Sequence, residues 1–425
     1  MAVVALLLTV DGVDVQMLGV TVSAIAADWG LPLSAFGAAM AAGHLGSAIG
    51  AATGGLAADV IGRRPTMLLG VAWFGTFMLA TLVARTPEEI AIARVLAGIG
   101  LGGTLPPALA LISEILPARL RPLGVSLAIL TAPLGVALAG LSAAAMLPAF
   151  GWRAMYLVFG LLPFVVAIIA LAVLPESPTY LARFPERRQQ LQRVLARFAM
   201  EARPETAGPK TRRAGIGALL SERSIEILSI FAGFFFAYIS ISLIFGWMPA
   251  LFTRNGFSPS LAGVVLSVFA TSGMAGIIVA GVLMSAFGTR PIALSYILGS
   301  ACAIAALTFA LPASPAALGD GLASFRFYGA IAVAGFLLNG VMTSLFAHAA
   351  ATFPDAVRAT GLGFAATSGR VGAICGSFFG AQIVEIVGPS AFFSAVAGLS
   401  MLTFLLLIAG AATAPKRSAP SVAPN

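Results

Sequence analysis

Long apolar stretches, separated by short polar breaks, run along almost the whole chain. Each is long enough to cross the hydrocarbon core of a bilayer as a helix, which takes about 20 residues. Barrel strands alternate over only about 10 residues, so a β-barrel does not fit. The pattern predicts an all-α membrane protein with twelve transmembrane helices, at residues 2–27, 34–58, 63–84, 87–113, 121–148, 152–174, 225–251, 259–286, 290–311, 324–352, 357–385 and 388–413.

One long polar segment divides the twelve stretches into six and six. It predicts four parts, namely a first bundle at 1–174, a cytoplasmic linker at 175–224, a second bundle at 225–413 and a tail at 414–425. Within the linker, apolar residues recur at helical spacing between arginines, at Leu191, Val194, Leu195 and Phe198. That spacing predicts an amphipathic helix lying on the membrane surface.

A twelve-residue sequence at a break between two stretches occurs twice. GGLAADVIGRRP at 54–65 matches AGVLMSAFGTRP at 280–291, with a shift of 226 residues. A second match aligns 114–127 with 351–364 in the same direction. The halves are therefore parallel repeats, and we expect two six-helix bundles related by a pseudo-twofold axis along the membrane normal. Many secondary transporters are built from such repeats.

The composition agrees with a membrane protein, and the placement of the basic residues argues against nucleic-acid binding. Hydrophobic residues make up 59% of the chain and charged residues only 9%, against roughly 25% charged in soluble proteins. The net charge of +8 does not indicate nucleic-acid binding, because 18 of the 24 Lys and Arg residues fall in breaks on one side of the predicted membrane. Since basic residues stay cytoplasmic, both termini are predicted to be cytoplasmic.

Asp11 and Asp14 lie about midway along the first stretch, where a charge costs roughly 2.5–3.5 kcal/mol. At a spacing of three they share one helix face. Burial and a like-charged neighbour both stabilise the protonated form of a carboxyl group. We therefore predict that this pair binds and releases a coupling proton. The alternative is a hydrogen-bonded pair that only braces the helix.

Arg94 and Arg370 also lie inside predicted helices and need anionic partners. A guanidinium binds a carboxylate through two parallel hydrogen bonds. One hypothesis is that the arginines bind a carboxylate of the substrate. Another is that they pair internally with Asp11, Asp14 or Glu385. A third is that such a pair holds in the empty protein and is broken by substrate or by a proton.

Five further residues inside the stretches have side chains suited to a polar or aromatic ligand. His44 titrates near neutral pH and is a candidate for moving the proton. Asn339 and Gln16 are candidates for hydrogen bonds to substrate, although bridging between helices is an equal possibility. Trp247 and Tyr238 belong to the most aromatic stretch, where an aromatic ring would stack or where these residues only pack.

Signals for catalysis and cofactors are missing from the sequence. The phosphate-binding pattern GxxxxGK[ST] does not occur, so ATP is not the expected energy source. Only two His and two Cys are present, and no nucleophile–base arrangement stands out. We expect no metal, no cofactor and no enzyme activity.

The repeated break resembles the inner-loop motif of the major facilitator superfamily, through Gly55, Asp59, Gly62, Arg63 and Arg64. A narrower resemblance covers most of the chain. DGVDVQMLG in the first stretch, RVLAGIGLGG in the fourth, LPESPTYL at 174–181 and FPDAVRATG at 353–361 are similar to motifs of the aromatic acid:proton symporters.

The resemblance implies a mechanism and a location. Asp59 would cap the eleventh helix, while Arg63 would pair with Glu114, so that this group locks the outward-open state. The chain would be a monomeric symporter in a bacterial inner membrane, importing a small organic anion, an aromatic carboxylate, with protons. Alternatives are a proton-coupled transporter of another metabolite, a drug efflux antiporter, or a membrane sensor that kept the transporter fold.

Overall fold

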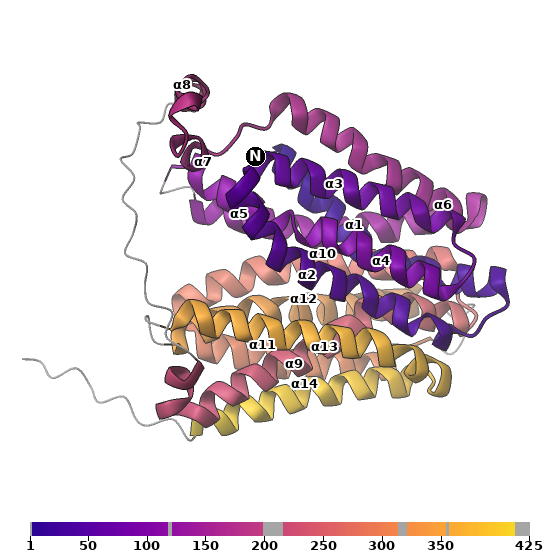
Figure 1. Cartoon of the computed structure of the whole chain (residues 1–425). Helices are drawn as coiled ribbons and strands as arrows, with labels where there is room; N and C mark the ends of the chain where they lie inside the picture. Colours follow the sequence, from indigo (N-terminus) through magenta and orange to yellow (C-terminus); the bar gives the residue numbers. More distant parts are fainter. Residues whose placement is uncertain (1, 118–120, 199–215, 313–320, 354–356, 413–425) are drawn as a thin grey trace, which may run out of the picture.

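A computed structural model describes residues 2–117, 121–198, 216–312, 321–353 and 357–412, and every regular element in these ranges is helical (Figure 1). The first bundle consists of α1 (Ala2–Trp29), α2 (Gly37–Ile61), α3 (Arg63–Ala80), α4 (Pro87–Gly102), α5 (Leu105–Ile115) and α6 (Arg121–Val173). The second consists of α9 (Ile216–Arg254), α10 (Pro259–Phe287), α11 (Thr289–Ala310), α12 (Gly321–Thr352), α13 (Arg358–Ile386) and α14 (Pro389–Ala412).

Short elements join these helices at two opposite ends of the molecule. At one end, which we call the linker end, lie α7 (Pro178–Ala182), the 3₁₀ turn η4 (Pro185–Arg187) and α8 (Arg188–Arg197). At the opposite end, the far end, lie η1 (Leu33–Phe36) and η2 (Thr81–Val83). The charge pattern predicts that the linker end is cytoplasmic.

Three helices differ from the predicted stretches. The fourth predicted stretch is divided into α4 and α5 at Gly103–Thr104, because Pro106 and Pro107 have no N–H to donate to the preceding turn. α9 begins at Ile216, before the predicted start at residue 225. The helix α6 contains two predicted stretches, which meet at Gly151, whose φ is 71°.

Ten segments of the described ranges are long and apolar enough to cross a membrane. One of them, 130–173, is 44 residues long and includes residues of α6 on both sides of Gly151. The 29-residue helix α13 is not among the ten. The chain is therefore a multi-pass membrane protein, and the number twelve stays a prediction.

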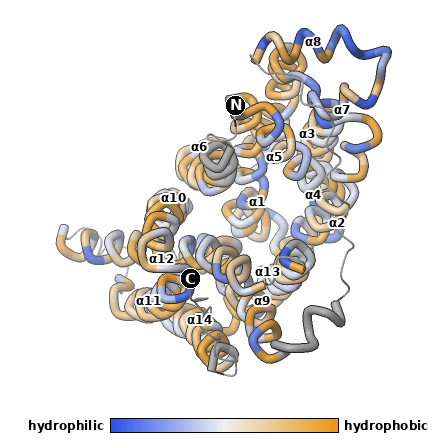
Figure 2. The backbone as a smooth tube through the Cα atoms, turned by 90° about the vertical axis from the view of Figure 1, so that its left-hand side faces the viewer, coloured by the Kyte–Doolittle hydropathy of each residue, from blue (hydrophilic) through white to orange (hydrophobic). Residues whose placement is uncertain are grey.

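Helix pairing follows the sequence repeat. Within the bundles, the most extensive contacts pair α1 with α6 and α2 with α4, and the repeat equivalents are α9 with α13 and α10 with α12. Between the bundles, α6 meets α10 and α2 meets α13, again as symmetry equivalents, while α1 meets α9. Figure 2, viewed from the linker end, shows α1 at the centre, where the two bundles meet.

Glycines allow the paired helices to touch through their backbones. A Cβ atom at Gly46 or Gly50 of α2 would collide with the carbonyl oxygens of Val95 and Ile99 on α4. In the second bundle, a Cβ at Gly276 of α10 would collide with the backbone of α12 in the same way. Such close approach is how helices associate in lipid, where burial of apolar side chains gives no driving force.

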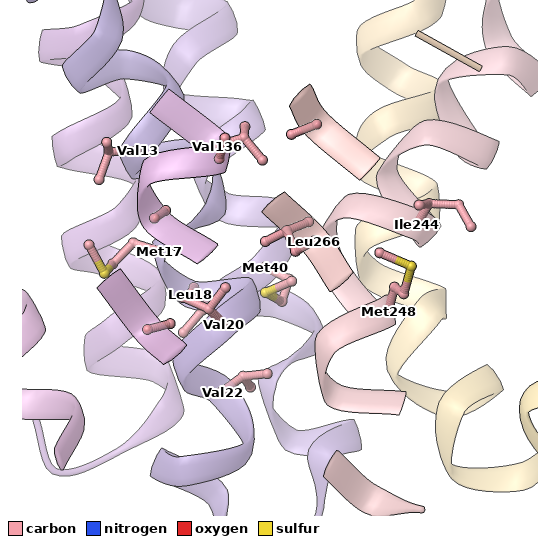
Figure 3. Close-up of a cluster of buried hydrophobic side chains, with 14 of the residues drawn as sticks. Val13, Met17, Leu18, Val20, Val22, Met40, Val136, Ile244, Met248 and Leu266 are labelled. Atoms are coloured by element: carbon pink, nitrogen blue, oxygen red, sulfur yellow. The ribbon is translucent and has the colours of Figure 1, made fainter. Parts of the chain in front are cut away.

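Buried apolar side chains continue from one bundle into the other. Figure 3 shows part of this core, in which Met17 and Met40 of the first bundle lie on the same layer as Leu266 and Met248 of the second. The Met40 methyl group reaches the backbone of Gly246 on α9. The bundles are thus packed against each other as well as internally.

Candidate functional site

The middle of α1 places its two carboxylates in different surroundings. Counting ~1.5 Å per residue, Asp11 lies about 14 Å and Asp14 about 18 Å from the start of the helix. Asp11 is half-buried and has no hydrogen bond or ion pair to another described residue. Asp14 is buried. Between them, Gly12 lies directly against the backbone of Ala132, which fixes this turn of α1 against α6.

Arg94 of α4 is paired with Asp14. Its Nη1 donates to Asp14 Oδ1 at 2.6 Å and to the Asp14 carbonyl oxygen at 3.0 Å. Only 6% and 5% of the two side-chain surfaces are exposed, so water screens this ion pair little. Arg94 Nε is buried and has no hydrogen-bond partner among the described residues. Arg94 is thus paired internally in this structure, and its contact with a substrate carboxylate stays a prediction.

Helix α2 leaves room for this guanidinium at Gly43. A Cβ atom there would lie 2.7 Å from Arg94 Nη2 and 3.2 Å from both Cζ and Nε. The next residue, His44, is half-buried on the same helix turn. The structure thus brings Asp14, Arg94 and the α2 turn of His44 together in the first bundle.

Arg370 of α13 is in a different situation. It lies about 18 Å into its helix at ~1.5 Å per residue, is half-buried, and has no ion pair or hydrogen bond to another described residue. The preceding residue, Gly369, is in contact with the ring of Tyr238 on α9. Tyr238 is half-buried and its ring stacks on Phe234 at 6.4 Å between centroids. Arg370, which has no anionic partner among the described residues, therefore directly follows a residue that touches the Tyr238 ring.

Trp247 does not fit the predicted role as a ligand contact. Its side chain has no exposed surface, and its Nε1 donates to the Ser377 carbonyl oxygen at 2.9 Å. Gly380 of α13 lies directly against the indole ring. Because all faces and the N–H are engaged, Trp247 packs α9 against α13.

Asn339 and Gln16 also form protein contacts instead of facing an open space. Asn339 Nδ2 donates to Gly335 of its own helix at 2.9 Å, and its amide fills the space beside Gly273 of α10. Gln16 is fully buried and donates to the Phe245 carbonyl oxygen, which joins α1 to α9 across the two bundles. Gln16 therefore bridges two helices, whereas the hydrogen bond of Asn339 lies within its own helix.

At the linker end, the turn between α2 and α3 is built around Gly62 and Glu176. Gly62 has a φ of 104°, a region that only glycine adopts without strain. Glu176 Oε1 accepts from the backbone N–H groups of Arg63 at 2.9 Å and Arg64 at 3.2 Å, which are free donors at the start of α3. The repeat equivalent of Gly62, Gly288, has a φ of 87°.

The Arg63 side chain contacts two carboxylates at this end. Its Nη2 lies 3.5 Å from Asp59 Oδ1 and 3.5 Å from Glu114 Oε1. Ser177 donates a hydrogen bond to the other Glu114 oxygen. Asp59 is exposed and its ion pair lies within its own bundle, whereas the family pattern implied that it caps the eleventh helix. We call Asp59, Arg63, Glu114, Glu176 and Ser177 the linker-end cluster.

At the far end, hydrogen bonds cross between the bundles. The N–H of Ser34 in η1 donates to Glu385 Oε1 of α13 at 2.9 Å. The hydroxyls of Thr253 and Ser23 are 2.7 Å apart, joining α9 to α1. Backbone contact of Gly37 with the Phe378 carbonyl adds to this closure. The structure is therefore closed at its far end.

Sequence reasoning missed Glu176 and Glu385 in these places. For Glu176 a signal existed, since the Glu-Ser-Pro sequence after the sixth stretch has an acid beside a helix-capping serine, and Ser177 does cap α7. For Glu385 no signal existed, because Ser34 lies 351 residues away in the chain.

Comparisons with known proteins agree with this geometry. The family model of the Major Facilitator Superfamily matches residues 4–327 and 230–424. A gallate transporter of Pseudomonas putida is 33% identical over 425 residues, covering 98% of this chain and 92% of the relative. A 4-hydroxybenzoate transporter of Pseudomonas aeruginosa is 30% identical, covering 90% and 85%. The crystal structure of a D-xylose-proton symporter superposes with a TM-score of 0.74 at 17% identity, covering 97% of each chain.

The two repeated helix bundles and the similarity to these transporters identify the chain as a membrane transporter and not an enzyme. The chain belongs to the Major Facilitator Superfamily. The predicted resemblance to its aromatic acid transporters is confirmed by the gallate and 4-hydroxybenzoate relatives.

Proposed function

We propose that this protein is a proton-coupled symporter that imports a single-ring aromatic carboxylate by alternating access. The observation that carries the proposal is the contrast between the two mid-depth arginines. Arg94 is neutralised by Asp14, whereas Arg370 has no anionic partner among the described residues. A cation left without a partner inside a membrane protein favours an anionic ligand.

Arg370 and Tyr238 form the proposed substrate site. The planar guanidinium offers a carboxylate two parallel hydrogen bonds. Tyr238 beside it offers both a ring for stacking and a hydroxyl group. These features suit gallate or 4-hydroxybenzoate, which relatives of this chain transport.

Charge balance supports coupling to a proton. The mid-depth set of Asp11, Asp14, Arg94 and Arg370 sums to zero when all four are ionised. Binding of a monocarboxylate makes the sum negative, which is unfavourable away from water. A proton on Asp11, which is half-buried and has no partner among the described residues, restores the balance. Substrate anion and proton would then cross together.

Alternating access assigns roles to the two ends. With the linker end cytoplasmic, closure of the far end excludes an outward-open state. The linker-end cluster would hold the cytoplasmic side together in the outward-facing state, when Asp59 exchanges its contact with Arg63 for the start of α13. His44 follows Gly43, which lies against Arg94, and would help to move the proton near the Asp14–Arg94 pair during this change.

Uptake into proteoliposomes tests the proposal. We expect labelled 4-hydroxybenzoate or gallate to accumulate when the outside is acidic, and not without a pH gradient. Arg370→Gln should raise KM by about 10- to 100-fold. This change corresponds to the loss of a charge-assisted hydrogen bond that contributes roughly 1.5–3 kcal/mol. Arg326→Gln, an exposed arginine of α12, is the matched control and should behave as wild type.

Three results would contradict the proposal. Uptake that ignores the pH gradient would exclude proton coupling. An unchanged KM in Arg370→Gln would remove Arg370 from the substrate site. Binding without any flux would favour the sensor alternative.

A further inference from the structure

A cavity of small-molecule size lies at the far end, where the two bundles meet. Its volume is about 370 Å³, and its walls come from α1, η1 and α6 of the first bundle and from α9 and α10 of the second. Ser23, Ala27 and Leu33 line one side, and Thr253, Arg254 and Phe257 line the other. This volume lies within the range of ~300–1,000 Å³ typical of ligand sites.

Arg254 is the charged residue in this otherwise mostly apolar lining. Its Nη1 donates to the Val384 carbonyl oxygen at 3.0 Å, which orients the guanidinium from the α13 side. The residue is otherwise exposed, so the remaining N–H donors are accessible to a ligand. Apolar walls with one oriented guanidinium complement an aromatic ring that carries a carboxylate.

We propose that the cavity is a second, regulatory site for a single-ring aromatic carboxylate. The ring lies between Leu33 and Phe257, and the carboxylate binds Arg254. The ligand class rests on the proposed function, because the substrate itself is the aromatic carboxylate present on that side at high concentration.

The site exists only while the far end is closed. Its walls belong to different bundles and are joined by the hydroxyl contact of Thr253 with Ser23. Leu33 directly precedes Ser34, whose N–H is held by Glu385. Opening of the far end separates these walls. A ligand that binds one state alone shifts the population toward that state. Occupation of the cavity therefore keeps the far end closed and slows return to the outward-facing state.

The consequence is inhibition by excess substrate from the far side. Uptake of 4-hydroxybenzoate by wild-type proteoliposomes should rise, pass a maximum and then fall as the external concentration increases. Arg254→Gln should abolish the fall and leave KM within about twofold, because Arg254 is separate from Arg370 and Tyr238. Ala27→Phe, which fills the cavity and keeps the Arg254 cation, should have the same effect.

Equilibrium dialysis separates this inference from the transport proposal. The full chain in phosphatidylcholine nanodiscs should bind two 4-hydroxybenzoate molecules, of which Arg254→Gln removes one and Arg370→Gln removes the other. The affinity of the Arg254 site should fall at least about tenfold in Arg254→Gln. Arg326→Gln, an exposed arginine at the same end but outside the cavity, is the matched control and should keep both sites.

Specific results would overturn the inference. These are a single binding site in the wild type, a fall in uptake that persists in both Arg254→Gln and Ala27→Phe, or an Arg254-dependent effect that appears only with anionic lipid. If transport fails in every variant while Arg254-dependent binding of 4-hydroxybenzoate remains, the transport proposal is wrong and the cavity assignment holds.

Discussion

At the scale of residues, two arginines that look alike in the sequence differ in their surroundings. Both stand alone among apolar neighbours, and the same alternatives applied to each. Folding places Asp14 against Arg94, with an Nη1–Oδ1 distance of 2.6 Å, and brings no acid of the described residues to Arg370. The chain spacing of 80 residues between Asp14 and Arg94 gives no hint of that choice.

The Asp14–Arg94 pair predicts a large effect on stability. Asp14→Asn leaves a buried cation unpaired, which costs about 3–5 kcal/mol. We expect a clear fall of the melting temperature in detergent, and a smaller one in the double variant Asp14→Asn with Arg94→Gln. Asp11→Asn is the matched control and should melt near the wild-type temperature, since Asp11 has no ion-pair partner among the described residues. Equal losses in Asp11→Asn and Asp14→Asn would argue against the pair.

Asp11 makes a separate prediction about coupling. With Asp11→Asn the site cannot gain or lose the proposed proton, so uphill accumulation of substrate should disappear. Exchange of labelled for unlabelled substrate across the membrane should continue, because it needs no net proton movement. The two assays use the same proteoliposomes. Retained accumulation in this variant would assign the proton to another group.

At the scale of elements, the turn between α2 and α3 shows why the repeated motif needs its glycine. Gly62 has a φ of 104°, and a Cβ atom there would also lie 2.5 Å from Glu176 Oε2. The sequence indicated the turn through the repeat of Gly62 as Gly288. It did not indicate Glu176, whose carboxylate binds the free N–H groups of α3.

Substitution of this glycine tests that account. Gly62→Ala should destabilise the protein by about 1–3 kcal/mol, through backbone strain and displacement of Glu176. Gly55→Ala, in the same motif, is the control, because nothing lies within 4 Å of a Cβ at that position. Thermal unfolding in detergent measures both. If Gly55→Ala were the more damaging variant, the motif would act through contacts other than this turn.

At the scale of the whole molecule, closure of the far end depends on contacts between residues remote in sequence. Glu385 holds Ser34 of η1, and Thr253 meets Ser23. Loss of the Glu385 contact should favour the outward-facing state. Spin labels at Leu31→Cys and Ile386→Cys, two exposed positions on either side of the contact, would measure the distance after Cys302 and Cys375 are replaced.

We expect Glu385→Ala to add a longer-distance population between these labels, and saturating 4-hydroxybenzoate to reduce it. Glu89→Ala, an acid at the same end that accepts from the backbone of Arg85 within its own bundle, is the control and should leave the distances unchanged. Identical distance distributions in Glu385→Ala and in wild type would show that this contact does not hold the far end closed.

The sequence by itself determined the helices, their division into two repeats and the family. These follow from local properties, namely apolar stretches long enough to span lipid and a glycine-rich turn that recurs 226 residues later. It also nominated the mid-depth charges as candidates, because an ionised group inside an apolar stretch stands out on its own. Only the tertiary structure decided which of them pair, since Asp14 with Arg94 and Ser34 with Glu385 meet through helix packing across long distances in sequence. The same packing turned Trp247 from a candidate ligand contact into a buried residue, because whether a ring faces a neighbour or a ligand depends on what lies opposite it.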